Sequence, residues 1–328
     1  MAQPPLDPGV VESLVKDAAS APSMHNTQPW TFRFLRDSGV LQLRGDAERG
    51  LPRADPGGRA LHLGCGAALF NLRVAVAHAG WQPVASLLPD PADPWLLAEV
   101  AFAGSVRPDD DLAVLHPAIH RRHTSRFPFT DEEIPDGILD GLCGAALLEG
   151  AHLRVPDAWH VQNLLDLVHD AEGRESMDPE ARAETARWTE TGAGGASRPE
   201  GIPTYAYGPR QLDVTAPVRD FAGRQNLPGR ASATFERWPR LVLLGTTDDR
   251  PEDWLRAGQA MERVLLQATL DGLVASLTSQ ALEWPELRWA VRDPRSTMGH
   301  VQMVIRLGYG PTGPATPRRP VRDVLDIV

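Results

Sequence analysis

Cysteine is scarce in this chain of 328 residues. The two cysteines, Cys65 and Cys143, are isolated and neither belongs to a Cys-x-x-Cys pair, so the sequence excludes a disulfide framework and favours a reduced, cytoplasmic setting. The N-terminus has no basic stretch followed by an apolar run, and no apolar stretch approaches the length of a membrane span. We therefore expect a cytoplasmic protein without a membrane partner.

Positive charge is also in short supply. The chain has 33 Lys and Arg against 43 Asp and Glu, a net charge of −10, which argues against a general nucleic-acid partner. Any anionic ligand needs a local basic cluster. The length allows two domains or one large one, and the apolar composition, with 6% aromatic residues, is typical of a globular protein with an ample core.

Several catalytic motifs are missing. Neither a Gly-x-Gly-x-x-Gly nor a Walker sequence occurs, so a nucleotide on a Rossmann fold is not expected. Ser23 and His25 lack a Gly-x-Ser-x-Gly elbow and an evident orienting acid, which argues against a hydrolase. Three histidines are spaced as metal ligands on a helix would be, but a proline and adjacent arginines favour a charged turn, and we expect no metal. They are His116, His120 and His123.

The stretch from Ala21 to Trp30 carries an unusual density of polar atoms. Ser23, Asn26 and Gln28 offer a hydroxyl and two carboxamides, while flanking prolines stiffen the backbone. Such a loop suits a flat heterocycle with its own carbonyls and ring nitrogens. The alternative for each residue is an Asx or Ser turn that caps its own backbone.

Periodicity predicts the elements around this loop. An amphipathic helix over residues 8–20 precedes it, and a hairpin of residues 31–35 and 40–43 follows. A long apolar helix over 62–80 ends at a glycine, and a strand near 95–102 closes the first half. The sequence from 107 onward then repeats these features.

The repeat is visible as two offsets. Residues 137–142 match 9–14 at an offset of 128, and residues 261–272 match 69–80 at an offset of 192. Residues 301–307 correspond to 96–102 as the closing strand. This pattern indicates a duplicated and fused gene, although any two amphipathic helices resemble each other.

The change of offset places an insertion in the second half, at about residues 171–235. It contains a charged helical stretch, a Gly-rich segment over 192–197 and an arm rich in proline and tyrosine. A Gly-rich hinge followed by such an arm is typical of a lid over a pocket. A surface loop is the alternative.

A basic cluster supplies the local positive charge that an anion would need. Residues 120–126 hold three arginines, two histidines and two hydroxyls. Arginines bind a phosphate bidentately, and hydroxyls fill the remaining acceptor positions. A solvated run of charge is the alternative.

The residue pattern Pro-Ser-x-x-Asn-x-Gln-Pro-Trp-x-Phe, over residues 22–32, resembles the signature loop of the FMN-dependent nitroreductase family. In that family the loop crosses a dimer interface to touch the flavin of the other subunit. The whole chain resembles the long actinobacterial, Acg-type branch, in which one chain carries two nitroreductase-like halves. The resemblance implies an α+β, nitroreductase-like fold of two fused halves, residues 1–106 and 107–328, the second carrying the inserted segment of about 171–235.

The resemblance also implies a cofactor site. His120–Arg126 is similar to the Arg-Arg-Ser-x-Arg motif that binds the FMN phosphate and ribityl chain, with threonine in place of the first serine. A basic residue after the Gly-Tyr turn forms a second phosphate contact, and the segment from Gly272 to Gln280 passes the flavin N5 edge. The implied cofactor-binding residues are Pro22, Ser23, Met24, Asn26, Gln28, Arg122, His123, Thr124, Arg126, Ser279, Gln280, Arg318 and Arg319.

The two halves differ in what they retain. The first has the signature loop but no arginine cluster, and the second has the cluster but no such loop, which predicts one non-covalent FMN per chain between the halves. We expect a pseudo-dimeric monomer or a homodimer of whole chains.

The resemblance implies NAD(P)H-dependent reduction of nitroaromatic or quinone-like small molecules by a ping-pong hydride transfer through flavin N5, with no catalytic side chain. NADH or NADPH is the expected donor. The alternatives are an FMN-sequestering or storage protein with a closed lid, and dehydrogenation of a biosynthetic intermediate.

Overall fold

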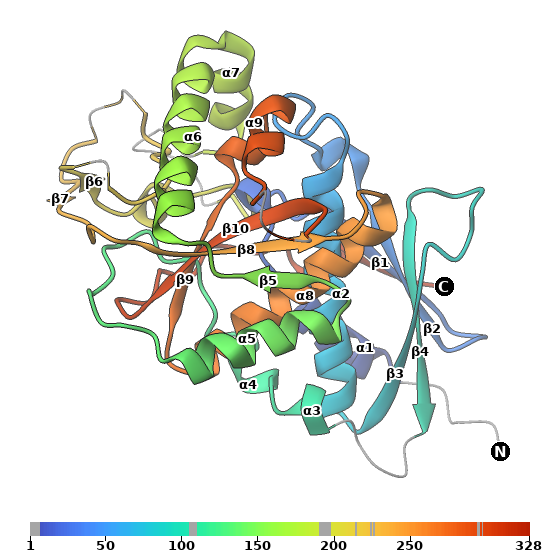
Figure 1. Cartoon of the computed structure of the whole chain (residues 1–328). Helices are drawn as coiled ribbons and strands as arrows, with labels where there is room; N and C mark the ends of the chain where they lie inside the picture. The colour runs from blue at the N-terminus through green and yellow to red at the C-terminus, as the bar shows by residue number, and fades with distance from the viewer. Residues whose placement is uncertain are drawn as a thin grey trace.

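Two long helices lie side by side between two mainly antiparallel sheets (Figure 1). They are α2 (Arg59–His78) and α8 (Pro251–Leu270). The structure is a computed structural model, and it describes residues 7–104, 110–189, 198–213, 215–223, 225, 227–293, 296 and 298–328.

The first sheet has the order β11-β1-β2-β4-β3. Neighbouring strands are antiparallel except β11, which pairs with β1 in parallel. In β1 every second side chain is buried, because Trp30, Phe32 and Phe34 face the core while their neighbours face outward. The strands are β1 (Trp30–Leu35), β2 (Val40–Gly45), β3 (Trp81–Leu87), β4 (Leu96–Gly104) and β11 (Leu325–Ile327).

The second sheet has the order β5-β8-β10-β9, all antiparallel. If the strands β5, β8, β9 and β10 are counted from one to four in chain order, the second sheet has the order 1-2-4-3. The strands β1 to β4 of the first sheet have the same order. The helix α1 (Pro8–Ala18) packs on α2, and α5 (Asp136–Leu148) packs on α8 in the same way. The strands are β5 (His152–Arg154), β8 (Arg240–Thr246), β9 (Val274–Thr278) and β10 (His300–Gly308).

Helix α2 is long and apolar enough to span a membrane, with a mean hydropathy of 1.4. The expectation that no stretch approaches that length was therefore wrong. However, 94% of the apolar window is buried inside the protein. The helix is apolar all round because protein covers it on all sides, as expected of a central core helix.

The two central helices touch at a pair of glycines, Gly66 and Gly258. A Cβ atom on Gly66 would lie 2.3 Å from the carbonyl oxygen of Leu255, and one on Gly258 would lie 2.2 Å from that of Leu63. Both pairs, Gly66 with Gly258 and Leu63 with Leu255, are separated by 192 residues, which is the offset found in the sequence. The crossing is therefore close to two-fold symmetric.

We expect Gly66→Ala and Gly258→Ala each to lower the free energy of unfolding by ~1–3 kcal/mol. The added methyl group would meet a backbone carbonyl of the other helix, so the two helices would have to move apart. Gly141→Ala is the matched control: it lies on the exposed face of α5 with nothing within 4 Å, and should stabilise the protein by ~0.5–1 kcal/mol. Urea unfolding measures all three. Equal effects at the three positions would contradict the close crossing.

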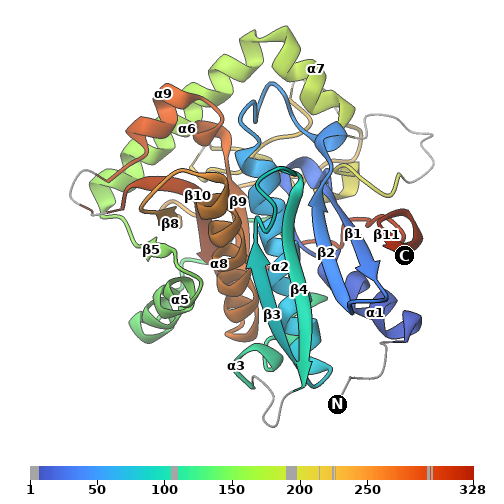
Figure 2. The same ribbon diagram turned by 90° about the vertical axis from the view of Figure 1, so that its right-hand side faces the viewer.

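The inserted segment begins with a helical arm and returns over the first half. Figure 2 shows α6 and α7 passing above both central helices. In α7, Glu184 accepts hydrogen bonds from the backbone N–H groups of Arg53 and Ala54, which fixes the arm to the first half. The elements are α6 (Ala158–Met177), α7 (Pro179–Arg187), the short pair β6 (Arg210–Gln211) and β7 (Ser232–Ala233), with α9 (Pro285–Ala290) beside them.

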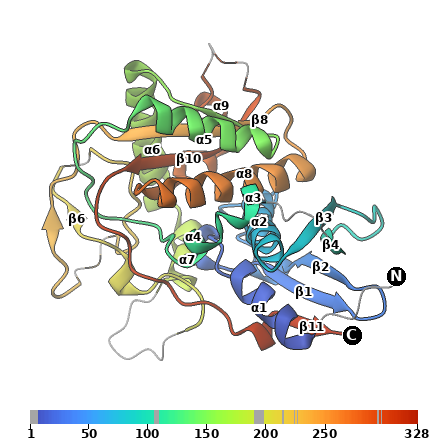
Figure 3. The ribbon, with the colours of Figure 1, turned by 90° about the horizontal axis from the view of Figure 1, so that it is seen from below.

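The C-terminal segment leaves the second sheet and ends in the first. After β10 it crosses the molecule and adds β11 beside β1 (Figure 3). Sequence periodicity did not predict β11, because three residues are too few to show a pattern. The predicted hairpin, the two long helices and the closing strands are confirmed. The predicted hinge at 192–197 and the boundary at 106/107 lie outside the described residues.

Candidate functional site

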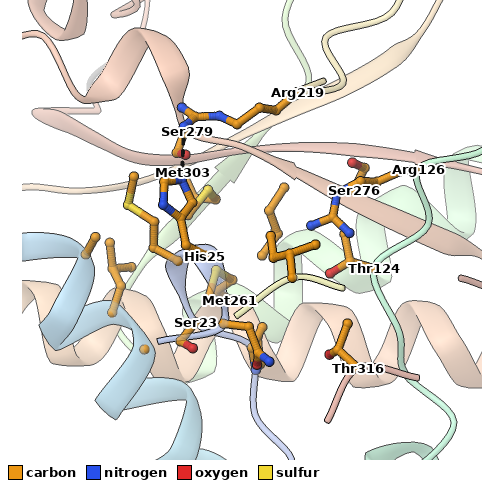
Figure 4. Close-up of a pocket in the computed structure, with 18 of the residues that line it drawn as sticks. Ser23, His25, Thr124, Arg126, Arg219, Met261, Ser276, Ser279, Met303 and Thr316 are labelled. Atoms are coloured by element: carbon orange, nitrogen blue, oxygen red, sulfur yellow. Dashed lines mark hydrogen bonds between the residues drawn. The ribbon is translucent and has the colours of Figure 1, made fainter. Parts of the chain in front are cut away.

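A cavity of about 100 Å³ lies where the two halves meet the inserted segment. Figure 4 shows side chains from the loop before β1, from the segment before α5, from α8, β9 and β10, and from the C-terminal segment converging on it. The lining includes eleven of the thirteen residues that the sequence indicated. They are Pro22, Ser23, Met24, Asn26, Arg122, His123, Thr124, Arg126, Ser279, Gln280 and Arg318.

The loop after α1 is held in a tight, irregular conformation. His25, Asn26 and Gln28 have φ values of 50°, 55° and 52°, a left-handed conformation that few side chains adopt readily. The hydroxyl of Ser23 accepts a hydrogen bond of 2.9 Å from the backbone N–H of Gln28 and closes the turn. The surroundings therefore maintain a strained backbone at the cavity wall.

Gln28 and Arg319 are the two indicated residues that do not line the cavity. The side chain of Gln28 is fully buried: its amide donates to the carbonyl of Pro199 at 2.8 Å and its carbonyl accepts from the backbone N–H of Arg319 at 2.8 Å. The guanidinium of Arg319 points to backbone carbonyls of β1 and of Asp323. Both residues position the loop against its neighbours.

Asn26 connects three parts of the chain. Its amide donates to the carbonyl of Gly201 at 2.9 Å, in the inserted segment, and to that of Pro317 at 3.1 Å. Its carbonyl oxygen accepts from Arg318 at 3.0 Å. The carboxamide thus aligns a cavity arginine, the loop and the insertion.

Positive charge gathers at one end of the cavity. Arg122 and Arg318 both donate to the carbonyl of Ser20, at the C-terminal end of α1, at 3.1 Å. The buried Nε atoms of both arginines have no hydrogen-bond partner within the described ranges. Burial and the neighbouring Arg122 lower the pKa of Arg318 to about 9. Such a pair fits a phosphate, which supplies the missing acceptors and neutralises the charge.

A buried carboxylate lies beside this pair. Glu262 of α8 is fully buried, and its Oε1 lies 3.3 Å from the Nε of Arg122. Burial raises the pKa of Glu262. Sequence reasoning missed this residue, although its signal was present as one acid on the apolar face of a helix.

The rest of the basic segment passes along β9. Thr124 forms a bridge with Ala275, and the next residue donates its backbone N–H to the same alanine at 2.8 Å. Arg126 donates to the carbonyl of Ala206 at 3.0 Å, and its guanidinium lies 5.0 Å from the ring centre of Phe221. Burial lowers the pKa of Arg126 to about 10, and no ion pair to it occurs in the described chain.

The inserted segment forms the opposite wall of the cavity with Ile202, Arg219 and Phe221. Arg219 pairs with Glu283 and donates to the Nε2 of His25 at 3.0 Å, so the ring proton of a neutral His25 is on Nδ1. The ring of Phe221 meets that imidazole edge-on at 5.6 Å. Neither Arg219 nor Phe221 could be identified from the sequence, because both lie far along the chain from the motifs.

His25 predicts a pH dependence of stability. Burial, followed by the charge of Arg219, lowers the pKa of His25 well below 6.5. Below pH 6.5 the unfolded chain binds a proton that the folded chain does not, so stability is lost as the pH falls, by at most about 1.4 kcal/mol per pH unit. His25→Asn, which tolerates the left-handed backbone, should flatten the change between pH 7 and pH 5 in urea unfolding. His169→Asn, exposed on α6, is the control. Identical pH profiles for all three proteins would refute this assignment.

The histidines spaced as metal ligands have another role. The Nε2 atoms of His116 and His120 lie 2.9 Å and 2.7 Å from the two carboxylate oxygens of Asp17, in α1. These contacts join the segment before α5 to the end of α1. In the part of the chain that the structure describes, no group of three His, Cys, Asp or Glu residues could hold a metal ion.

The sequence is similar to known proteins over nearly its whole length. A model described as "Nitroreductase family" matches residues 119–309. A Mycobacterium tuberculosis protein named "Putative NAD(P)H nitroreductase Rv3131" is 34% identical over 330 residues, covering 98% of this chain and 92% of the relative. Another from that organism, "Putative NAD(P)H nitroreductase acg", is 30% identical, covering 97% and 96%.

Solved structures resemble the chain more distantly. A BluB-like flavoprotein from Clostridium difficile 630 is 15% identical, covers 65% of this chain and 98% of its own, and has a TM-score of 0.42. An FMN- and NADPH-dependent nitroreductase from a Sphingopyxis strain is 16% identical, covers 65% of this chain and 97% of its own, and has a TM-score of 0.41.

Proposed function

This chain belongs to the nitroreductase family, and on that basis we propose that it is an oxidoreductase that binds one non-covalent FMN in the cavity between its halves. The observation that carries the proposal is the pair of buried guanidinium groups, Arg122 and Arg318: within the described ranges the Nε of Arg318 has no hydrogen-bond partner, and the Nε of Arg122 has only an ion pair of 3.3 Å to Glu262. The FMN phosphate would accept from both arginines. The C-terminal end of α1, which already binds them, keeps them oriented.

In this proposal different cavity residues bind different parts of the FMN molecule. Thr124 and Arg126 hold the ribityl chain and the ring, while Ser279 and Gln280 follow β9 at the ring edge. The walls of the insertion exclude water from the ring. When bound, FMN would supply the redox chemistry for the two-electron reduction of a nitroaromatic or quinone-like acceptor, with NADH or NADPH as the donor.

The test is anaerobic stopped-flow mixing of the FMN-loaded protein with NADH and, separately, with NADPH. We expect at least one of the two nucleotides to bleach the flavin absorbance within seconds of mixing. A flavin that dithionite bleaches but neither nucleotide does would reject an NAD(P)H-dependent reductase.

The proposal of one FMN per chain is supported by the contacts at the second, pseudo-equivalent position. Glu149, which lies 128 residues after Ala21, forms ion pairs with Arg73 and with Arg263, the latter at 2.8 Å. The carboxylate is 6% exposed. A closed network of side chains therefore lies where a second phosphate site would need free arginines.

A second candidate function, FMN sequestration, is favoured by the size of the cavity. Its volume of about 100 Å³ is below the ~300–1,000 Å³ of pockets that bind drug-sized ligands. Binding of the flavin ring would therefore require some of the cavity walls to move, and the insertion forms one of these walls. A closed insertion would keep a nicotinamide from stacking on the flavin.

One ion pair outside the cavity tests whether the insertion controls access. Arg49 pairs with Glu200 at 2.5 Å and donates to the carbonyl of Thr27 at 3.0 Å, joining the insertion to the loop. We expect Glu200→Gln to raise the rate of FMN release ~2–5-fold, because such a partly exposed pair contributes up to ~1 kcal/mol. The measurement is the rate at which bound FMN is replaced when the protein is mixed, in a stopped-flow instrument, with an excess of a riboflavin analogue that competes for the site. Asp326→Asn, which removes the exposed pair with Arg33, is the control. Equal release rates would show that the insertion does not limit exchange.

A further inference from the structure

Arg59 is a buried cation that forms no ion pair with the described part of the chain. It begins α2, is 7% exposed and lines the cavity. Its Nη1 donates to the backbone carbonyl of Gln302 at 2.5 Å, and no ion pair to Arg59 is formed by the described part of the chain. Burial lowers its pKa to about 10. A buried charge without an ion pair lowers the stability of the fold, so a role in binding is the expected reason for its presence.

The nearby carboxylates are already bound to other groups. Asp55 accepts from the backbone N–H of Leu61 at 3.0 Å and caps α2. Glu283 pairs with Arg219, and Asp249 forms a bidentate pair with Arg288 at 2.7 Å on both oxygens. The charge of Asp55 acts on Arg59, but none of these carboxylates forms an ion pair with it, so the guanidinium keeps donors for a ligand.

The position of Arg59 relates it to the reactive end of the cavity. The phosphate end is defined by Arg122 and Arg318, which meet at the C-terminal end of α1. Arg59 instead lines a hollow together with Glu283, whose carboxylate binds Arg219 and accepts a hydrogen bond from Ser279 at 2.8 Å. Figure 4 shows Ser279 and Arg219 together at the end of the cavity away from Thr316. A flavin bound by its phosphate would extend its ring toward Arg59.

Arg59 also lines a second hollow, of about 240 Å³, on the outer side of α2. Its walls include two tryptophans, Trp254 and Trp289, together with the cations Arg288 and Arg292 and the carboxylates Asp55 and Glu283, of which Glu283 is paired with Arg219. Trp289 is 68% exposed, and the guanidinium of Arg292 lies 4.1 Å from its ring centre. Flat aromatic surfaces beside arginine guanidinium groups suit a planar anion. The hollow offers such a molecule a route to Arg59 that does not pass the phosphate end.

We propose that Arg59 binds the carboxylate of a planar, aromatic electron acceptor, which enters through this outer hollow and places its ring beside the flavin. The proposal rests on the proposed function, since it needs a flavin in the cavity. It narrows the substrate class to aromatic carboxylates. Arg59 then determines specificity, because its guanidinium favours a negatively charged acceptor and takes no part in the electron transfer.

The test compares two ligands that differ only in charge, 4-nitrobenzoate and 4-nitrobenzamide. Calorimetric titration of the FMN-loaded protein should give at least ~10-fold tighter binding of the carboxylate, the scale of a charge-assisted hydrogen bond. Arg59→Gln should remove that preference, and Arg59→Lys should recover part of it. Arg256→Gln, which removes one exposed arginine from α8, should leave it unchanged.

Two further measurements separate the outcomes. Arg59→Gln should keep the parent's FMN content and melt at the same or a higher temperature, because it removes an unpaired buried charge. Equal binding of the two ligands by the FMN-loaded parent, an undiminished preference in Arg59→Gln, or a large loss of stability in that variant would overturn the proposal. Failure of the parent to bind FMN would instead reject the proposed function on which it rests.

Discussion

Replacing Arg122 by alanine is expected to raise the dissociation constant for FMN ~10–150-fold, which corresponds to ~1.5–3 kcal/mol for hydrogen bonds to a charged group. Arg122 is 6% exposed, and apart from its bond to Ser20 and its ion pair of 3.3 Å with Glu262 its guanidinium has no further partner among the described residues, which leaves donors for the phosphate. Fluorescence titration of the apoprotein with FMN measures the change. Arg121→Ala removes an exposed arginine at the adjacent position and should change the constant little.

Glu262 makes this experiment more specific. Removing Arg122 also leaves the buried Glu262 carboxylate without its nearest cation, 3.3 Å away. The double variant Arg122→Ala, Glu262→Gln removes both charges. We expect it to bind FMN as weakly as the single variant does, because the phosphate contact is still missing. Recovery of parental affinity in the double variant would mean that Arg122 serves only to neutralise Glu262.

The second large effect is on stability. Glu236→Leu is expected to lower the free energy of unfolding by ~3–5 kcal/mol, because it leaves a buried guanidinium unpaired. Arg306 of β10 is fully buried and pairs with Glu236 through two hydrogen bonds, and its guanidinium lies 3.5 Å from the ring centre of Phe129. Glu236 also accepts from the backbone N–H of Phe129 at 3.0 Å. Urea unfolding at neutral pH measures the loss.

The double variant Glu236→Leu, Arg306→Met is the control, because it removes both charges and keeps apolar volume. It should lose less stability than Glu236→Leu alone. The pair also affects the site indirectly: Arg306 donates to the carbonyl of Phe127, next to Arg126, at 3.0 Å. A double variant as unstable as the single one would show that packing around Phe129, and not charge, decides the effect.

The local parts of the site were predictable from the sequence because each is carried by a contiguous segment. The loop at 22–28 and the basic run at 120–126 contain their own chemistry, and all but one of the residues indicated in them line the cavity. The exception, Gln28, shows the limit of the pattern. A glutamine can bind either a flavin or backbone groups. In the fold its side chain is already bonded to two backbone segments that lie about 170 and 290 residues away in the chain, which the local sequence does not show.

The residues that the sequence could not indicate are those whose role depends on a distant partner. Arg59 and Arg219 are both arginines on the cavity wall, but Glu283 pairs with Arg219 and leaves Arg59 without an ion pair in the described chain. Only tertiary packing decides which of two such arginines is neutralised. The repeat was more accessible, since the offset of 192 reappears at the Gly66 and Gly258 crossing.

The most direct test of the account is the stoichiometry of flavin binding. Apoprotein of known concentration is titrated with FMN, and the break point is compared between the parent and a variant that carries both Arg122→Ala and Arg318→Ala. The account predicts one FMN per chain for the parent and no saturable binding for the variant in the same concentration range. Two FMN per chain, or a variant that binds as the parent does, would contradict a single site between the two halves.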